Sequence, residues 1–409
     1  MTRPSSRRRL AHAATIAASL GCTRVALGQC AYSYEVFPIP AGWSSTSPFE
    51  LRDDGTVVGA FKYPGQIASH AFRWRADTGF EVLTGPPGVS DKRAIAIAAN
   101  GLIAGDGHAA GTPPDSTQLV IWYDGTSSWV PNLGGGLYVS VDDAAGDGYV
   151  VGHYSVSGGT LPFIWHDGAF VPLPPEIASM YGCVLGINES LGITGYHVDY
   201  ARRIPQHAFV GSLSHIVDLP DIEGVFNPEP YDVTRSGHCA LTAYTATYLR
   251  RGYFWNGSSF EFIGLLPTAT YSRAFDINEV DQIVGESGVP SSTNRRGVLW
   301  QSGHLYDMNS LAVLPPGATI KSCSKISDDG TILATTPLQP SGAIDCILRP
   351  MTLDAADVTL DCRVNADDLM CVLGNWGPRA QAFVPRADLD GDGMIGPSDL
   401  AIVLGAWTP

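Results

Sequence analysis

The residues with the most definite chemistry are carboxylates near the C-terminus, spaced like the ligands of a hard cation. Residues 388–399 read DLDGDGMIGPSD. A loop wound around such a cation presents oxygens from positions 1, 3, 5, 7, 9 and 12, and a glycine at position 6, here Gly393, permits the sharp turn. The sequence therefore predicts a calcium site with these ligands: Asp388, Asp390, Asp392, the carbonyl of Met394, a water held at Gly396, and Asp399.

A weaker copy of the same pattern begins at Asp357. In the same positions it offers Asp357, Thr359, Asp361, the carbonyl of Arg363, Asn365 and Asp368. Cys362 stands at the position of the turn glycine, and a residue with a Cβ resists the positive φ that glycine adopts readily. We therefore expect this first loop to bind calcium with lower affinity than the second.

Each loop is followed by a segment with helical periodicity, and residues 365–376 parallel residues 396–407. Apolar side chains recur at i, i+3, i+4 and i+7, which predicts one amphipathic helix after each loop. The two stripes are Leu369, Val372, Leu373 and Trp376, and Leu400, Val403, Leu404 and Trp407. We expect them to pack against each other.

Two calcium loops of EF-hand type, each followed by one helix and without the usual entering helix, resemble a type I dockerin. The resemblance covers residues 357–409, which a short linker at residues 352–356 separates from the rest of the chain. It implies docking to a cohesin-like partner. In that family loop positions 10 and 11 help to set partner choice, and they fall on Ala366, Asp367, Pro397 and Ser398. Thr359 and Cys362 depart from the family's pattern.

Residues 32–351 contain one unit that recurs seven times. The unit is a series of short apolar runs. The third run ends at positions 74, 122, 165, 211, 255, 300 and 349, so successive units are 43 to 49 residues apart. A hairpin pattern precedes each of these runs and a fourth apolar run follows most of them, and four short strands at this period are typical of one β-propeller blade. The sequence therefore predicts an all-β fold, a seven-bladed β-propeller, followed by the small helical module.

The seventh unit stops after its third run, and the missing strand has a counterpart at the other end of the repeat region. Residues 36–40 read VFPIP and match residues 170–174, which read FVPLP and form the fourth run of another unit. We therefore expect the N-terminal segment to complete the last blade and to close the ring, because closure removes the open sheet edges that promote aggregation.

The repeats resemble the extracellular family named for its His-Ala-Phe tripeptide, which is present intact at residues 70–72 and 207–209. That resemblance implies a location outside the cytoplasm and no assigned chemistry. The recurring tryptophans are expected to pack between sheets, because a large aromatic ring fills the space between twisted blades. Asn100, Asn188 and Asn278 in the hairpin turns are expected to satisfy local backbone groups.

The first 28 residues have the composition of an export signal. Four arginines at positions 3 and 7–9 precede an apolar stretch at residues 10–20, and the small residues Ala26 and Gly28 follow. This pattern predicts a signal peptide of residues 1–28, used by either the Sec or the twin-arginine route, and a secreted or cell-surface protein.

Without this segment the chain carries 20 basic and 40 acidic side chains, a net charge near −20. A surface of this sign repels phosphate backbones, so nucleic acid is not an expected partner. No other stretch approaches the roughly 18 continuous apolar residues of a transmembrane segment. Seven cysteines remain, so at least one is unpaired.

These patterns favour a non-catalytic binding or display protein. The propeller would contact a glycan or a protein, and the C-terminal module would anchor it through calcium. One alternative is a polysaccharide-degrading enzyme, a glycoside hydrolase or a lyase, carried by the propeller. Another is a structural surface protein with a calcium-stabilised cap. No G-x-S-x-G motif is present, and carboxylates such as Asp232 and Glu286 cannot be paired without geometry, so no catalytic residue is predicted.

Overall fold

A computed structural model of the chain describes residues 32–109, 116–130, 138–199, 204–290, 294–338, 342–351, 355–358, 364–379, 382, 384 and 387–407. Residues 32–351 form one compact unit, and a second unit begins at residue 352. The predicted signal peptide lies outside the described residues. Within the part of the chain that is described, no helix is long and apolar enough to span a membrane.

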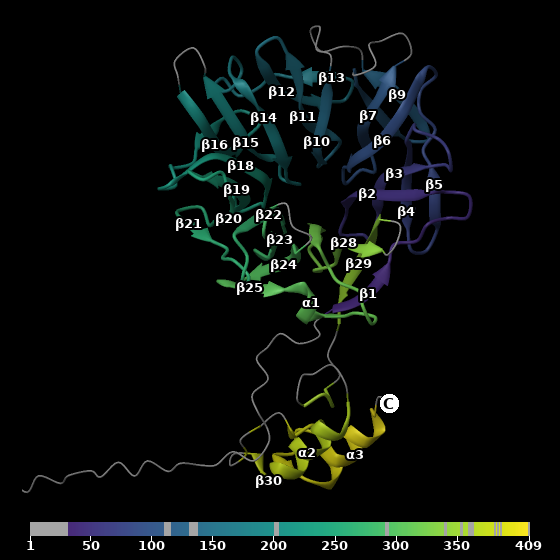
Figure 1. The fold of residues 1–409 in the computed structure, drawn as a ribbon, viewed down its shortest axis with the longest axis vertical. Coiled ribbons are helices and arrows are strands. Elements are labelled where there is room, and N and C mark those ends of the chain that lie inside the picture. Colours follow the sequence, from purple (N-terminus) through teal and green to yellow (C-terminus); the bar gives the residue numbers. More distant parts are fainter. Residues whose placement is uncertain are drawn as a thin grey trace, which may run out of the picture. The chain divides into compact units, whose positions relative to one another are not determined.

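The first unit is a seven-bladed β-propeller (Figure 1). Blade 1 contains β2 (Ser45–Leu51), β3 (Val57–Lys62), β4 (His70–Arg75) and β5 (Gly79–Val82). Blade 2 contains β6 (Val89–Ile97), β7 (Ile103–Ala109), β8 (Gln118–Tyr123) and β9 (Thr126–Val130). Blade 3 contains β10 (Val139–Ala145), β11 (Tyr149–Val156), β12 (Gly159–His166) and β13 (Ala169–Val171).

The remaining blades repeat this arrangement. Blade 4 contains β14 (Tyr181–Ile187), β15 (Gly192–Asp199), β16 (Ile204–Ser212) and β17 (Ile216–Asp218). Blade 5 contains β18 (Val225–Val233), β19 (Cys239–Thr245), β20 (Arg250–Trp255) and β21 (Phe260–Phe262). Blade 6 contains β22 (Tyr271–Ile277), β23 (Ile283–Gly288), β24 (Arg296–Gln301) and β25 (His304–Asp307), followed by the one-turn helix α1 (Met308–Leu311).

Blade 7 joins the two ends of the propeller chain. Its strands are β27 (Ser322–Ile326), β28 (Ile332–Leu338), β29 (Gly342–Pro350) and β1 (Tyr32–Val36), and β26 (Ala312–Val313) pairs with β1 as a fifth strand. The antiparallel ladder between β1 and β29 places Tyr32 opposite Pro350 and Val36 opposite Cys346. The N-terminal segment therefore closes the ring, as the sequence predicts.

The closing strand lies earlier in the chain than the predicted residues 36–40. It ends at Val36, and Pro38 and Pro40 lack the N–H groups that would continue the ladder. Phe37 turns into the core instead, where it is fully buried and its ring centroid lies 5.1 Å from that of Trp74. The prediction was therefore right about closure and about Val36, which pairs with Cys346, but the strand extends back to Tyr32 instead of forward to Pro40.

The recurring tryptophans pack between blades, which confirms their structural interpretation. Trp122 of blade 2 lies in a cluster with Val58 and Ala71 of blade 1, and its indole Nε1 donates to the Thr84 carbonyl at 3.0 Å. Trp300 of blade 6 packs against Phe254 of blade 5 in a tilted arrangement, with a centroid distance of 4.9 Å. Burial of each ring against the preceding sheet links neighbouring blades through apolar contact.

The first strand of every blade contains a β-bulge at the same place. The register between first and second strands shifts just before Glu50, Ala96, Asp143, Gly186, Asp232, Asp276 and Lys325. First strands of neighbouring blades contact one another around the ring. Since a bulge bends its strand and re-aims the side chains beside it, these seven positions are brought to one level of the propeller.

The C-terminal unit contains α2 (Ala366–Gly374), α3 (Pro397–Gly405) and a two-stranded ladder of β30 (Gly377–Pro378) with β31 (Met394–Ile395). Both predicted helices are present and contact each other. Their shared core includes Val372 and Val403, which are fully buried.

Candidate functional site

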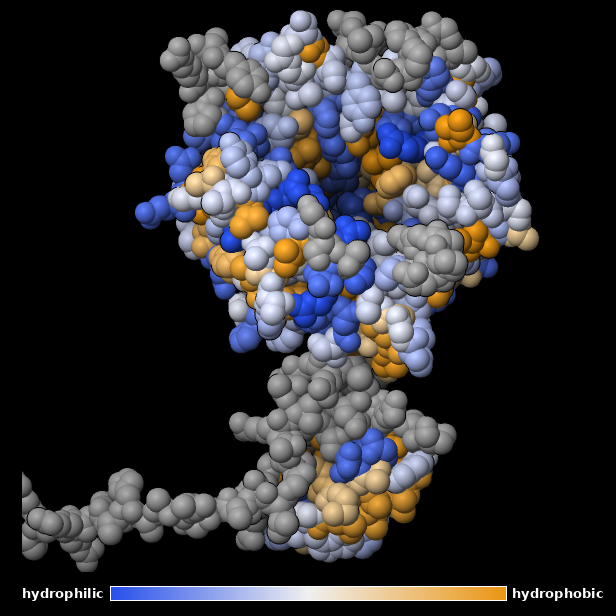
Figure 2. Space-filling view, viewed as in Figure 1, coloured by the Kyte–Doolittle hydropathy of each residue, from blue (hydrophilic) through white to orange (hydrophobic). Residues whose placement is uncertain are grey.

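A cavity of about 140 Å³ lies where the first strands of the propeller meet, and its lining is strongly charged. Figure 2 shows the corresponding hollow at the centre of the ring. Five of the seven bulge positions carry ionisable side chains that line it, and we call them the inner ring: Glu50, Asp143, Asp232, Asp276 and Lys325. The Lys325 Nζ lies 2.6 Å from Glu50 Oε2 and 3.5 Å from Asp276 Oδ1.

The aspartates of the inner ring accept backbone hydrogen bonds from the blade that follows. Asp143 Oδ2 accepts the Ile187 N–H at 2.9 Å, and Asp276 Oδ2 accepts the Ile326 N–H at 2.7 Å. The other oxygen of Asp143 accepts the N–H of Ala144 at 2.7 Å. Asp232 is arranged like Asp143, with bonds from Val233 and Ile277. Each of these aspartates therefore links its own blade to the next one through hydrogen bonds.

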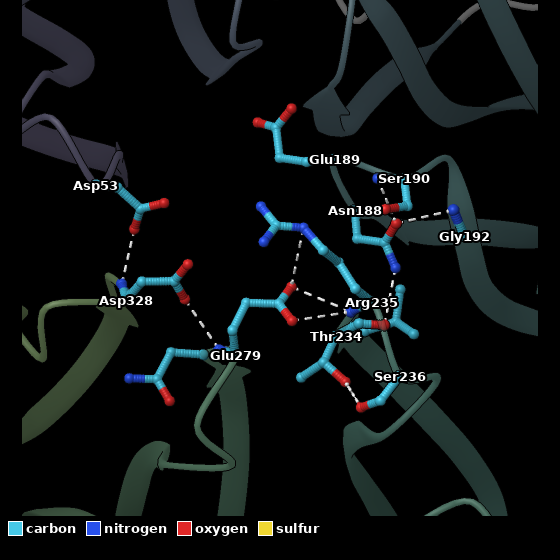
Figure 3. A network of polar contacts seen from close by, with 12 residues as sticks. Asp53, Asn188, Glu189, Ser190, Gly192, Thr234, Arg235, Ser236, Glu279 and Asp328 are labelled. Carbon is cyan, nitrogen blue, oxygen red and sulfur yellow. Dashed lines mark hydrogen bonds and ion pairs between the residues drawn. The ribbon is translucent and has the colours of Figure 1, made fainter.

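A second tier of acids, the outer ring, lies in the hairpin turns that follow the first strands: Asp53, Glu189, Glu279 and Asp328 (Figure 3). These side chains accept hydrogen bonds from the blade that precedes them. Asp53 Oδ1 accepts the Asp328 N–H at 2.7 Å, and Asp328 Oδ1 accepts the Glu279 N–H at 2.9 Å. Glu279 accepts the N–H of Arg235, which lies between the acids as a counter-charge.

The electrostatics of the cavity follow from burial of like charges. Burial raises the pKa of the Asp143 and Asp232 carboxyls to about 7, and the neighbouring acids contribute to the increase. The same causes raise the pKa of Asp276. Burial alone would lower the pKa of Lys325, but four surrounding carboxylates raise it. The lining holds eight acidic and three basic side chains, so the cavity is negative overall and favours a cationic group over an anionic one.

The structure separates the two carboxylates that the sequence left unpaired. Asp232 belongs to the inner ring, whereas Glu286 is buried elsewhere between Arg273 and Arg295, at 3.7 and 3.5 Å. The two carboxylates therefore belong to different clusters. Sequence reasoning missed the inner ring, although aligning the repeats at their first runs would have shown five charged residues at one position.

In the C-terminal unit, the structure brings together three of the predicted calcium ligands. One carboxylate oxygen from each of Asp388, Asp390 and Asp392 lies within 4.8 Å of the others. Each side chain also accepts a backbone hydrogen bond from within the loop: Gly393 N–H to Asp388 Oδ2 at 3.1 Å, Asp392 N–H to Asp390 Oδ1 at 3.1 Å, and Met394 N–H to Asp392 Oδ1 at 2.7 Å. The turn at Gly393 has a φ of 87°, as the pattern requires.

One oxygen of this group is buried without a partner. The Asp388 side chain is 0% exposed, and its Oδ1 has no hydrogen-bond partner among the described residues, while Oδ2 lies 3.6 Å from Arg379 Nη1. A buried carboxylate oxygen without a donor is costly, because it has lost water and gained nothing in return. The donor set of hard oxygens suits calcium.

Asp399 closes the loop but differs from the three other acids. Its Oδ1 accepts the Leu389 N–H at 2.6 Å, and its Oδ2 accepts the Gly396 N–H at 2.7 Å. Although burial opposes it, these backbone donors hold the pKa of Asp399 below its usual value. Asp399 thus fixes the junction between the loop and α3. Met394, another predicted ligand, pairs through its backbone with Pro378.

The first loop is described only in part, since Thr359, Asp361, Cys362 and Arg363 lie outside the described residues. Its closure matches that of the second loop, because Asp368 Oδ2 accepts the N–H of Asn365 at 2.9 Å in a capping box. Asp357 is buried, as Asp368 is. Cys371 on α2 is disulfide-bonded, and the other described cysteines have free thiols.

The predicted docking residues are exposed at the starts of the helices: Ala366 and Asp367 on α2, and Pro397 and Ser398 on α3. The two apolar stripes, in contrast, pack only in part. The fraction exposed is 46% for Leu373, 50% for Trp376, 54% for Leu404 and 41% for Trp407. The two stripes therefore pack against each other through their inner residues, such as Val372 and Val403, while their outer residues are exposed. Figure 2 shows a largely hydrophobic visible face on this unit.

No protein-family model matches the chain, and no curated protein sequence matches it. Solved structures match the propeller at low identity. A structure of prolyl endopeptidases is 10% identical over 79% of this chain, with a TM-score of 0.49, and this chain spans 51% of its length. The β-propeller domain of the trilobed protease from Pyrococcus furiosus is 11% identical over 76% of this chain and 98% of its own, with a TM-score of 0.48. A Trypanosoma rangeli sialidase in complex with sialic acid is 11% identical over 80% of this chain and 58% of its own, with a TM-score of 0.37. No activity follows from likeness at this level.

Proposed function

We propose that this is an exported, non-catalytic binding protein whose C-terminal unit binds calcium as a dockerin-like module and docks onto a cohesin-like partner. The observation that carries the proposal is the buried Asp388 Oδ1, which lies within a group of three carboxylates and has no donor in the described part of the chain. A bound cation would satisfy this oxygen and neutralise the group. The backbone hydrogen bonds within the loop hold the carboxylates in place before the cation arrives.

The docking surface consists of the exposed residues at the helix starts and the exposed half of each apolar stripe. Leu373 on α2 and Trp376 just after it correspond to Leu404 on α3 and Trp407 just after it, so the unit presents the same apolar pair twice. Exposed apolar area of this kind is typical of a protein interface. Calcium acts here by fixing the start of each helix, since the closing carboxylates Asp368 and Asp399 cap α2 and α3.

The propeller in this proposal contacts a glycan or a protein, and its negative cavity favours a ligand with a cationic group. The extracellular His-Ala-Phe repeat family remains the proposed origin of its blades. A polysaccharide-degrading enzyme is the alternative. The hydrogen bonds of the acids weigh against it, because Asp143 and Asp232 use both oxygens on backbone N–H groups and are poorly placed to give up a proton or attack a sugar.

The test uses the full chain. Chelator-treated protein is titrated with calcium in a calorimeter, and then mixed with a panel of cohesins with and without calcium. We expect calcium binding, a rise in the melting temperature of the C-terminal unit, and calcium-dependent capture by a cohesin. Calcium stabilisation without capture would favour the structural-cap alternative. Turnover of a polysaccharide by the propeller would overturn the non-catalytic assignment.

A further inference from the structure

A cluster of arginines lies at the edge of the propeller opposite to the acidic cavity, and the proposed function gives it no role. The first and third strands of a blade run in the same direction, so they begin at one edge of the sheet. The turns that carry the outer ring follow the first strands and lie at the other edge. Four residues at the starting edge of blades 5 and 6 form the arginine cluster: Arg250 and Arg251 on β20, Arg273 on β22, and Arg295 directly before β24.

Contacts between blades 5 and 6 bring these arginines together. Strand β20 lies beside β22 (Figure 1). Arg251 Nη1 crosses this junction and donates to the carbonyl of Thr270, directly before β22, at 2.8 Å. On blade 6, the Nη1 atoms of Arg273 and Arg295 lie 3.7 and 3.5 Å from the carboxylate oxygens of Glu286. The arginine cluster therefore spans the junction of the two blades.

The arginine cluster has many more hydrogen-bond donors than partners. A guanidinium carries five N–H donors. Within the described part of the chain, Arg250 donates one hydrogen bond, Arg251 donates two, and Arg295 has only an ion pair at 3.5 Å. Arg273 is held over the ring of Phe275, 4.3 Å from the centroid, and its buried Nε has no acceptor among the described residues. Because a buried donor without an acceptor is costly, this cluster favours a ligand with acceptor groups.

Charge is also unbalanced in the arginine cluster. Among the described residues, Glu286 is the one carboxylate within ion-pair distance of the four guanidiniums. Arg93 and Arg296, in contrast, each have a carboxylate to themselves: Asp106 at 2.8 Å and Asp307 at 2.7 Å. Without residues 1–28 the chain as a whole has a net charge near −20. A local excess of positive charge on such a protein directs an anionic ligand to this edge.

Aromatic rings continue the arginine cluster along the same edge. Tyr248 lies in the hairpin between β19 and β20, is 76% exposed, and has a φ of 59°, which is strained for a residue with a large side chain. The ring of Phe226, at the start of β18, lies 5.5 Å from the ring of Tyr248 and 6.3 Å from that of Tyr244, measured between centroids. Arg250 Nε donates to the Tyr244 hydroxyl at 3.1 Å. A row of rings thus joins the exposed tyrosine to the arginines.

We propose that this edge of blades 5 and 6 binds an acidic oligosaccharide built of uronic acid residues. The arginines bind its carboxylates, since a guanidinium matches a carboxylate with two parallel N–H bonds. Tyr248 and the rings beside it pack against the C–H faces of the sugars. An acidic peptide needs only the arginines and leaves the row of rings unused. A single-stranded nucleic acid uses both features, but its dense phosphate charge is repelled by the rest of the surface.

The inference rests on the proposed function in that it names the glycan that the propeller contacts, and its test is independent of calcium and of cohesin. Hexagalacturonate is titrated into the full chain in a calorimeter with chelator present. We expect binding that weakens as salt rises. The methyl ester of the same hexamer keeps the sugar rings without the charge and should not bind. Hexaglutamate and an oligothymidylate should bind more weakly than hexagalacturonate. Failure of this titration leaves cohesin docking untouched, and failure of docking leaves this titration untouched.

Substitutions at exposed positions test the roles of the side chains. Arg250→Gln and Arg295→Gln should each raise the dissociation constant of hexagalacturonate about 10-fold, because each removes a hydrogen bond between charged groups. Tyr248→Ala should raise it about 5-fold, whereas Tyr248→Phe keeps the ring and should bind like the wild type. Arg75→Gln and Tyr123→Ala are the matched controls, since they alter an exposed arginine and an exposed tyrosine in blades 1 and 2, and they should leave the affinity unchanged.

Melting curves establish that each variant is folded at the assay temperature. The proposal is overturned if hexagalacturonate does not bind the folded wild-type protein, or if its methyl ester, hexaglutamate or the oligothymidylate binds at least as tightly. It is also overturned if the folded Arg250→Gln, Arg295→Gln and Tyr248→Ala variants all keep the wild-type affinity.

Discussion

The propeller and the C-terminal unit both gather carboxylates, but they use the oxygens differently. In the inner ring, both carboxylate oxygens of Asp143 and of Asp232 accept backbone N–H groups. In each case one of the two N–H groups belongs to the next blade. In the C-terminal loop, one oxygen of Asp388 accepts the Gly393 N–H, and the other is buried without a donor among the residues that the structure describes. Carboxylates whose oxygens already accept hydrogen bonds therefore hold the structure together, whereas carboxylates with an oxygen that lacks a donor can bind a ligand.

The inner and outer rings also differ in direction. Asp276 of the inner ring bonds to blade 7, which follows its own blade, and Asp328 of the outer ring bonds back to blade 6. The interface between blades 6 and 7 is thus held from both sides. Interfaces 3–4 and 5–6 carry the same pairing, so charge at the centre of the propeller serves ring closure.

The largest effect should follow from removing the free oxygen of the ligand set. Asp388→Asn should raise the calcium dissociation constant by at least about 100-fold, since even partners outside the coordination shell change metal affinity by about 10- to 100-fold. Calorimetric titration of the chelator-treated full chain measures it. Asp221→Asn removes a highly exposed propeller carboxylate and should leave the affinity unchanged. Equal affinities for the wild type and Asp388→Asn would show that the carboxylates of the loop, like those of the inner ring, have a structural role and do not bind calcium.

The next largest effect concerns an inner-ring aspartate that links two blades. Asp276→Ala should lower the free energy of unfolding of the propeller by about 1–3 kcal/mol, because the buried Ile326 N–H loses its acceptor. Urea unfolding monitored by tryptophan fluorescence measures this. Asp276→Asn keeps an acceptor oxygen and should lose less. Calcium affinity should not change in either variant, and a change would contradict the separation of the two roles.

The pH dependence of propeller stability should reveal the buried acids. Asp143 and Asp232 have a pKa of about 7 when folded and an ordinary value near 3.8 when unfolded. The folded state therefore binds more protons between these values, and its stability falls as pH rises through this window and levels off above it. The double variant Asp143→Asn, Asp232→Asn should flatten this fall, measured as the difference between the free energies of unfolding from urea titrations at pH 5 and pH 8. An unchanged slope would show that these acids are ionised throughout.

The smallest effect is expected in the outer ring, where the acids are more exposed. Glu189→Gln keeps an acceptor for the Gly146 N–H and removes only the charge. It should change the free energy of unfolding by about 0.5 kcal/mol or less, and added salt should shrink the difference. The urea midpoints of the two proteins at low and high salt measure this. A larger loss would show that the outer ring contributes as much to the stability of the propeller as the inner ring does.

The sequence alone determined the number of blades, the closure of the ring by an N-terminal strand, and the two C-terminal helices. These features follow from local periodicity: four short apolar runs per unit, a repeat of constant length, and apolar residues at helical spacing. The position of the closing strand was less certain from sequence. The apolar match favoured residues 36–40, but the backbone of Pro38 and Pro40 cannot donate to the ladder.

Only the tertiary structure decided which carboxylates are free to bind a ligand. Glu50 and Lys325 are far apart in the chain, and their side chains meet at 2.6 Å because the ring closes. Likewise, the spacing of Asp388, Asp390 and Asp392 predicts a cation loop, but whether an oxygen lacks a donor depends on which backbone N–H groups the folded loop turns toward it. The physical reason is that residue type sets the chemistry available to a side chain, whereas burial and competing hydrogen bonds set how much of that chemistry remains unused.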